Sequence, residues 1–149
     1  QKKELNSTFV KEKNVVDNRT KGLQLFRTIC SACHGADGKG IENLAPPLKG
    51  SEYIDGSMHR LASIILHGLS GPVHVGGKLY QLNTEMPGLI NNSSISDQDI
   101  VDIIRFTQNA FAKEGKNISI DEVKKLRSQK PAGGGLFTEK ILLETNFDK

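Results

Sequence analysis

The pentapeptide at residues 30–34, Cys-Ser-Ala-Cys-His, limits the folds open to this chain more than any other feature. It uses both cysteines of the chain, and His34 follows the second one directly. C-x-x-C-H is the pattern of covalent c-type haem attachment, in which the thiols of Cys30 and Cys33 add to the two vinyl groups. His34 can then supply an axial imidazole to the iron. The sequence therefore predicts a fold built around one covalently held haem c.

Two other kinds of site share a C-x-x-C pair. A thioredoxin-like redox pair is expected beside a βαβ unit, and the apolar pattern of this chain predicts none. A four-ligand zinc site would need a second cysteine pair, which the chain lacks. Haem attachment is the favoured interpretation, and it leaves no cysteine for a disulfide.

The composition agrees with one small domain that has tails. The chain has 149 residues, of which 36% are hydrophobic and only 5% aromatic, and a buried haem would add apolar surface to so lean a core. The net charge is +3, and no basic run is interleaved with aromatic residues, so no nucleic acid is expected as a partner. No stretch approaches the roughly 18 apolar residues of a membrane span, so no transmembrane segment is expected in this chain.

The motif also bears on location. Because haem c is attached outside the cytoplasmic membrane, we expect a periplasmic or exported protein. The sequence begins at Gln1 rather than Met, so we expect a processed or excised form, whose precursor carried a signal or a membrane anchor.

Apolar spacing predicts a mostly helical fold. Residues 1–18 are polar and aperiodic and are expected to form an extended arm. Loops are expected at residues 35–40 and 81–92, and a flexible break at 131–135. A first helix is expected from residue 18 or 20 to residue 28. Further helices are expected at residues 57–67, 96–112 and 119–129 and from residue 138, with a β-hairpin at 73–80 that turns on Gly76 and Gly77.

Gly22 lies in the first expected helix, on nearly the same face as Phe26. A glycine inside a helix costs about 1 kcal/mol relative to alanine. We therefore expect another helix to approach closely at Gly22, and the alternative is an ordinary glycine that the helix tolerates.

The iron needs a second axial ligand or has an open site. The candidates by residue type are Met58, Met86, His59, His67 and His74. A methionine raises the reduction potential relative to two histidines. Met86 is favoured, because it lies before a proline in a loop about 50 residues after His34, long enough to reach the other face of the haem. The alternative for a methionine is a core filler, and the histidines are more often surface or packing residues.

Tyr80 is a candidate hydrogen-bond donor to a haem propionate. Packing of its ring, with the hydroxyl in water, is the alternative.

The chain resembles the class I cytochromes c over about residues 20–112. This resemblance implies an all-α fold with a small β-hairpin, here with extended N- and C-terminal tails, and a role as an electron-transfer protein rather than an enzyme. It also implies that Phe106 meets Gly22 and Phe26, that the Pro46 carbonyl accepts the ring N–H of His34, and that Leu48 packs on the haem. The matching features are Gly22, Phe26, the pentapeptide, Pro46-Pro47-Leu48, Met86-Pro87 and Phe106.

A narrower likeness concerns residues 45–51, residues 65–73 and the Gly-Gly hairpin with Tyr80. These are similar to the cytochrome c modules attached to bacterial periplasmic dehydrogenases of the quinoprotein type. In those modules the methionine lies in a Met-Pro motif after the hairpin, whereas here Gly88 follows Met86-Pro87 in place of a second proline.

The predicted function is electron transfer through a single haem ligated by His34 and Met86. The expected electron donor is a dehydrogenase, either a separate redox partner protein or a fused dehydrogenase domain. No small-molecule substrate is expected. The alternative is a haem enzyme, or a gas or redox sensor, with an open or labile sixth coordination site. The chain divides into an arm (1–18), a cytochrome c domain (19–112) and a C-terminal extension with short helices (113–149).

Overall fold

The structure is a computed structural model that describes residues 20–147, so the arm expected at residues 1–18 lies outside the described residues. The first helix begins with α-helical residues 20–25, continues as one π-helical turn, η1 (Phe26–Cys30), and ends with α2 (Ser31–His34). The expectation that this helix ends at residue 28 was wrong. No glycine or proline occurs between residue 28 and Gly35, whose φ of 79° leaves the helical region.

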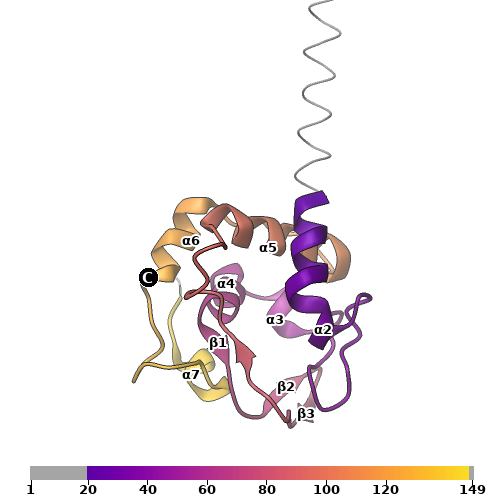
Figure 1. Cartoon of the computed structure of the whole chain (residues 1–149). Helices are drawn as coiled ribbons and strands as arrows, with labels where there is room; N and C mark the ends of the chain where they lie inside the picture. The colour runs from indigo at the N-terminus through magenta and orange to yellow at the C-terminus, as the bar shows by residue number, and fades with distance from the viewer. Residues whose placement is uncertain (1–19, 148–149) are drawn as a thin grey trace, which may run out of the picture.

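The first helix crosses α5 (Asp97–Phe111) at Gly22 (Figure 1). A Cβ atom at Gly22 would lie 2.5 Å from the carbonyl oxygen of Asp102, so only glycine allows the two backbones to approach this closely. One turn further along, the ring centroids of Phe26 and Phe106 are 5.0 Å apart. The expected close approach at Gly22 and the expected contact with Phe106 are both confirmed.

A second group of elements precedes α5. The short helix α3 (Glu52–Asp55) was not expected, because four residues are too few to give a helical period. The helix α4 (Met58–His67) was expected, and Ser57 caps it by accepting a hydrogen bond from the backbone N–H of Arg60. It ends at Gly68, which has a φ of 85°.

Two antiparallel strand pairs lie between α4 and α5 in the sequence. The expected hairpin is confirmed as β2 (Val73–Val75) and β3 (Lys78–Tyr80), with positive φ at both turn glycines. The other pair joins β1 (Gly68–Leu69) to β4 (Met86–Pro87). The β4 strand lies in the segment 81–92, which was expected to be a loop. A two-residue strand whose partner lies far away in the sequence leaves no periodic pattern, which is why it was missed.

The C-terminal extension folds back onto this domain. Its helix α6 (Ile120–Arg127) packs on α4 and α5, and Ser119 caps it in a capping box with Glu122. Its helix α7 (Glu139–Glu144) is capped by Thr138. In Figure 1, α6 and α7 lie on the side of the molecule away from α2. No helix within residues 20–147 is long and apolar enough to cross a membrane.

Glu139 ties α7 to the hairpin. Its carboxylate accepts hydrogen bonds from the backbone N–H of His74 (2.8 Å) and the hydroxyl of Tyr53 (2.9 Å), and it lies 2.7 Å from Nδ1 of His74. Burial raises the pKa of Glu139, but the hydrogen bonds from His74 and Tyr53 outweigh burial and hold the pKa below its ordinary value. The ionised carboxylate is therefore the form that stabilises the fold.

This arrangement predicts a pH dependence of stability. Because the pKa of Glu139 is lower in the folded than in the unfolded chain, its contribution is present above the ordinary carboxyl pKa and is lost as pH falls through the folded-state value. Between about pH 7 and pH 3, the free energy of unfolding should fall by about 1 kcal/mol more in the wild type than in Glu139→Gln. Urea denaturation measures this difference, with Glu144→Gln, an exposed change on the same helix, as the control. Parallel pH curves for the wild type and Glu139→Gln would contradict the assignment.

Candidate haem site

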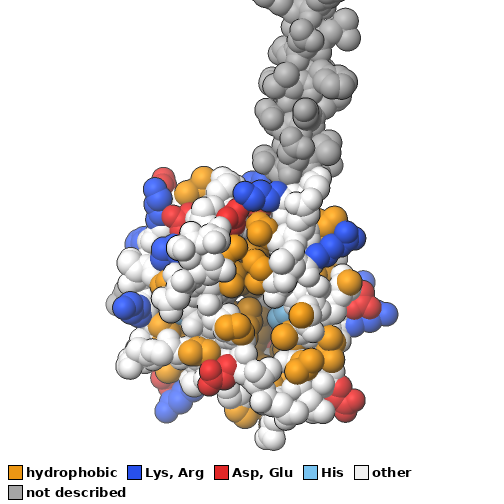
Figure 2. Space-filling model, in the orientation of Figure 1, with side chains coloured by type: hydrophobic (Ala, Val, Ile, Leu, Met, Phe, Trp, Pro, Cys, Tyr) orange, Lys and Arg blue, Asp and Glu red, His pale blue; other side chains and the backbone are white. Residues whose placement is uncertain are grey.

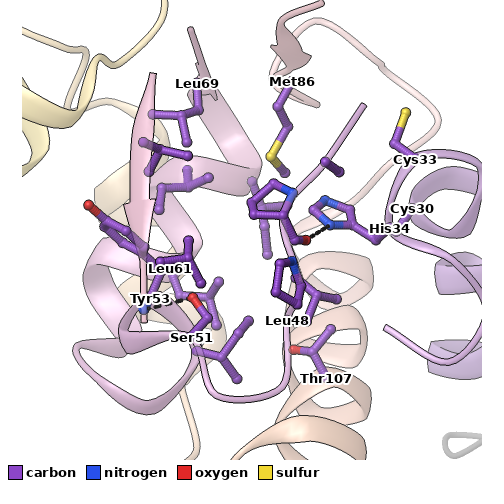
Figure 3. Close-up of a pocket in the computed structure, with 18 of the residues that line it drawn as sticks. Cys30, Cys33, His34, Leu48, Ser51, Tyr53, Leu61, Leu69, Met86 and Thr107 are labelled. Atoms are coloured by element: carbon purple, nitrogen blue, oxygen red, sulfur yellow. Dashed lines mark hydrogen bonds between the residues drawn. The ribbon is translucent and has the colours of Figure 1, made fainter. Parts of the chain in front are cut away.

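A large apolar pocket opens between the first helix, α4, the hairpin and the β4 segment (Figure 3). Its empty space, counted out to the open mouth and including solvent there, is about 1200 Å³. Figure 2 shows hydrophobic side chains gathered around a hollow in this face, with a histidine at its edge. A pocket with so apolar a lining fits an apolar group such as a macrocycle better than a small polar substrate.

Both cysteines line this pocket. Burial, together with the neighbouring Cys33, raises the pKa of Cys30 to about 11. Each thiol could form a thioether by adding its sulfur and hydrogen across one vinyl double bond, whereas a structural zinc site takes four protein ligands. Within residues 20–147, no group of three or more histidine, cysteine or acidic side chains could hold a metal ion. The donor set thus fits a covalent haem and not a zinc centre.

His34 ends α2 at the pocket wall. Its Nδ1 lies 3.4 Å from the carbonyl oxygen of Pro46 (Figure 3). Burial lowers the pKa of His34 and outweighs the hydrogen bond to Pro46, so the ring is neutral at pH 7. A neutral ring that donates from Nδ1 leaves its Nε2 lone pair free for a metal, and the hydrogen bond fixes the orientation of the ring.

The loop that carries Pro46 is held in place at Gly40. A Cβ atom at Gly40 would lie 2.5 Å from the carbonyl oxygen of Ala45 and 2.8 Å from the carbonyl carbon of Pro46. The backbone N–H of Gly40 also donates to the carbonyl of His34 at 2.8 Å. The acceptor and the imidazole are therefore parts of one packed loop.

Met86 lies on β4, and in Figure 3 its thioether is directed toward the part of the pocket that holds the His34 imidazole. The backbone that follows is fixed to the end of α4, because the N–H groups of Leu89 and Ile90 donate to Ile65 and Leu66 at 3.0 Å. These carbonyls at the end of the helix would otherwise lack partners. The fold thus brings a soft sulfur donor to the pocket that holds the imidazole.

The other candidate ligands have different neighbours, and none of them is among the described residues that line the pocket. His67 is buried with Nε2 2.9 Å from the carbonyl of Leu126, and Met58 is a core residue. His59 lies beside Glu122 and His74 beside Glu139. The geometry therefore supports Met86 among the candidates named from the sequence.

The two remaining predicted contacts differ in outcome. Leu48 lines the pocket, where the backbone N–H of Leu48 donates to the carbonyl of Gly38. Tyr80 is not among the lining residues, so its hydrogen bond to a propionate stays a prediction.

Tyr53 lines the pocket instead, and sequence reasoning missed it because α3 gives no periodic signal. Arg60 lies over the Tyr53 ring, with its guanidinium carbon 4.7 Å from the ring centroid.

Comparison with known proteins adds independent information. The family model for cytochrome c matches residues 20–111. Two cytochromes c-552 of Thermus thermophilus are each 30% identical over 111 residues, which cover 68% of this chain and 80% and 71% of the two relatives. The cytochrome c subunit of a quinone alcohol dehydrogenase from Gluconobacter oxydans is 27% identical over 114 residues, 72% of this chain and 22% of that subunit. The matches thus include both a cytochrome c-552 and a subunit of an enzyme complex.

Proposed function

The chain belongs to the cytochrome c family, and from that premise we propose that it transfers electrons through one haem ligated by His34 and Met86. Family membership means that the chain holds a covalent haem c and serves electron transfer rather than catalysis. Cys30 and Cys33 are the proposed attachment residues. The single observation that carries the ligand assignment is that His34 and Met86, from distant segments, lie in one apolar pocket.

When bound, the haem supplies a one-electron couple at its iron. The protein's part is to set the potential of that couple and keep its geometry fixed. His34 gives a neutral imidazole oriented by Pro46, and Met86 gives a neutral sulfur, a pair that favours the reduced state more than two histidines do. The apolar walls keep water away, and the backbone bonds after Met86 hold its strand, so little has to rearrange when the charge changes.

The proposed electron donor is a dehydrogenase. The support is the similarity to the cytochrome c subunit of a quinone alcohol dehydrogenase, which also supports the existence of a redox partner protein. In this proposal the donor is either a separate protein or a domain fused to residues 19–112. The proposed location is the periplasm or outside the cell, because haem c is attached beyond the cytoplasmic membrane.

Carbon monoxide distinguishes this function from that of a haem enzyme or sensor with an open site. Because CO needs a vacant axial position, we expect the ferrous spectrum of the haem-loaded protein to stay unchanged for minutes after CO is added. Met86→Ala vacates that position and should bind CO on mixing, which provides the positive control. A CO adduct in the wild type within the mixing time would favour the open-site alternative.

A further inference from the structure

The C-terminal extension lies beyond the family match, and its described part, residues 113–147, contributes Phe137 to the far edge of β1. Leu69 of β1 pairs with Met86 on one edge and with Phe137 on the other. The N–H of Phe137 donates to Gly68 at 3.0 Å, and the N–H of Ser70 donates back to Phe137 at 2.8 Å. The extension therefore adds a third backbone segment to the strand pair that carries Met86.

The Phe137 side chain fills the space behind this strand pair. It is 1% exposed and belongs to a cluster with Ile64, Val73 and Leu142, against which Met86 itself packs. Its ring centroid is 5.9 Å from that of His67, at the end of α4. The apolar support behind Met86 thus comes in part from the extension.

Glu139 provides a second attachment two residues further on. It accepts a hydrogen bond from Tyr53, a pocket-lining residue, and from the backbone of His74 on the hairpin. The extension is therefore fixed to the pocket wall as well as to β1.

The strand pair needs such support because it is very short. β1 and β4 have two residues each, and an isolated two-stranded pair is marginal at best in water. The backbones also meet closely, since a Cβ atom at Gly68 would lie 2.6 Å from the carbonyl oxygen of Met86. A displacement of β1 would therefore displace Met86 as well.

We propose that Phe137 is a positioning residue for the axial methionine: the extension holds β1, and through β1 it holds the Met86 strand in its ligating position. This inference rests on the proposed His34/Met86 ligation. It gives the extension a function at the redox site, in addition to its part in the fold. The positioning role of Phe137 is measured by the rate at which Met86 leaves the iron. Global stability alone does not set this rate.

Cyanide binding to the ferric, haem-loaded protein measures that rate, because cyanide enters only when Met86 leaves. We expect Phe137→Ala to bind cyanide roughly fivefold faster or more. Leu126→Ala is the matched control, since Leu126 is also a buried residue of the extension but belongs to α6, which packs on α4 and α5. The control should stay within about twofold of the wild type, because the backbone bonds of the extension to β1 are made by Phe137 and not by α6.

The outcomes separate this inference from the proposed function. If Met86→Ala leaves the cyanide rate unchanged, the methionine ligation itself fails. If Met86→Ala accelerates cyanide binding while Phe137→Ala matches the wild type or Leu126→Ala, only the positioning role is overturned. Should Phe137→Ala not fold, the milder pair Phe137→Leu and Val123→Ala gives the same comparison, since both wild-type side chains are fully buried.

Discussion

Met86→Ala is expected to lower the reduction potential by on the order of 0.1 V, a fraction of the roughly 0.8 V over which axial ligands move haem potentials. The physical reason is the loss of a neutral, soft sulfur that favours the ferrous state. The shorter side chain also admits water to an otherwise apolar pocket, and water stabilises the more highly charged ferric state. Both effects act in the same direction.

A spectroelectrochemical titration measures this change. The matched control is Met58→Ala, because Met58 is buried in the core and does not line the pocket. Met58→Ala should lose stability and keep its potential. An unchanged potential in Met86→Ala, or an equal drop in both variants, would show that Met86 has no special role at the iron.

Gly22→Ala is expected to lower the free energy of unfolding by about 1–3 kcal/mol, the usual cost of overpacking a tight contact. The direction of this change in the free energy of unfolding is informative, because alanine in place of glycine inside a helix would otherwise add about 1 kcal/mol of stability. Here the new methyl group would lie 2.5 Å from a backbone oxygen of α5, and 3.2 Å from Cβ of Phe106. The helices must separate, and the contact between Phe26 and Phe106 loosens with them.

Guanidinium denaturation of the haem-loaded protein tests this expectation. Gly115→Ala is the control, because a Cβ atom there meets only the side-chain oxygen of Asn109, at 3.5 Å. The control should change the free energy of unfolding by less than about 0.5 kcal/mol. A Gly22→Ala protein as stable as the wild type would mean that the two helices do not touch at this position.

The parts of the fold that could be predicted are those with local signals. Ser96 and Ser119 each begin a helix three residues before an acidic partner, and both capping boxes are present. Gly76 and Gly77 turn the hairpin, because this turn needs positive φ at both positions. Glycine inside a helix lowers stability relative to alanine. For Gly22, this loss of stability was the only sign in the sequence that a distant segment approaches it closely.

The parts that could not be predicted depend on contacts between distant segments. The pairing of β1 with β4 joins two residues to two others, and Phe137 completes it from still further along the chain. Tyr53 lines the pocket, whereas Tyr80, the tyrosine named from the sequence, is not among the lining residues. The sequence named Met86 as a ligand by residue type and loop length, but only the packed structure indicates what holds it.

The central claim is that Met86 closes the haem site opposite His34. The ferric absorption spectrum of the haem-loaded wild type at neutral pH tests it most directly, because methionine sulfur on ferric haem gives a weak band at the red end of the visible range. We predict that the wild type shows this band, that Met58→Ala keeps it, and that Met86→Ala abolishes it. A wild-type spectrum without the band, unchanged by Met86→Ala, would contradict the claim.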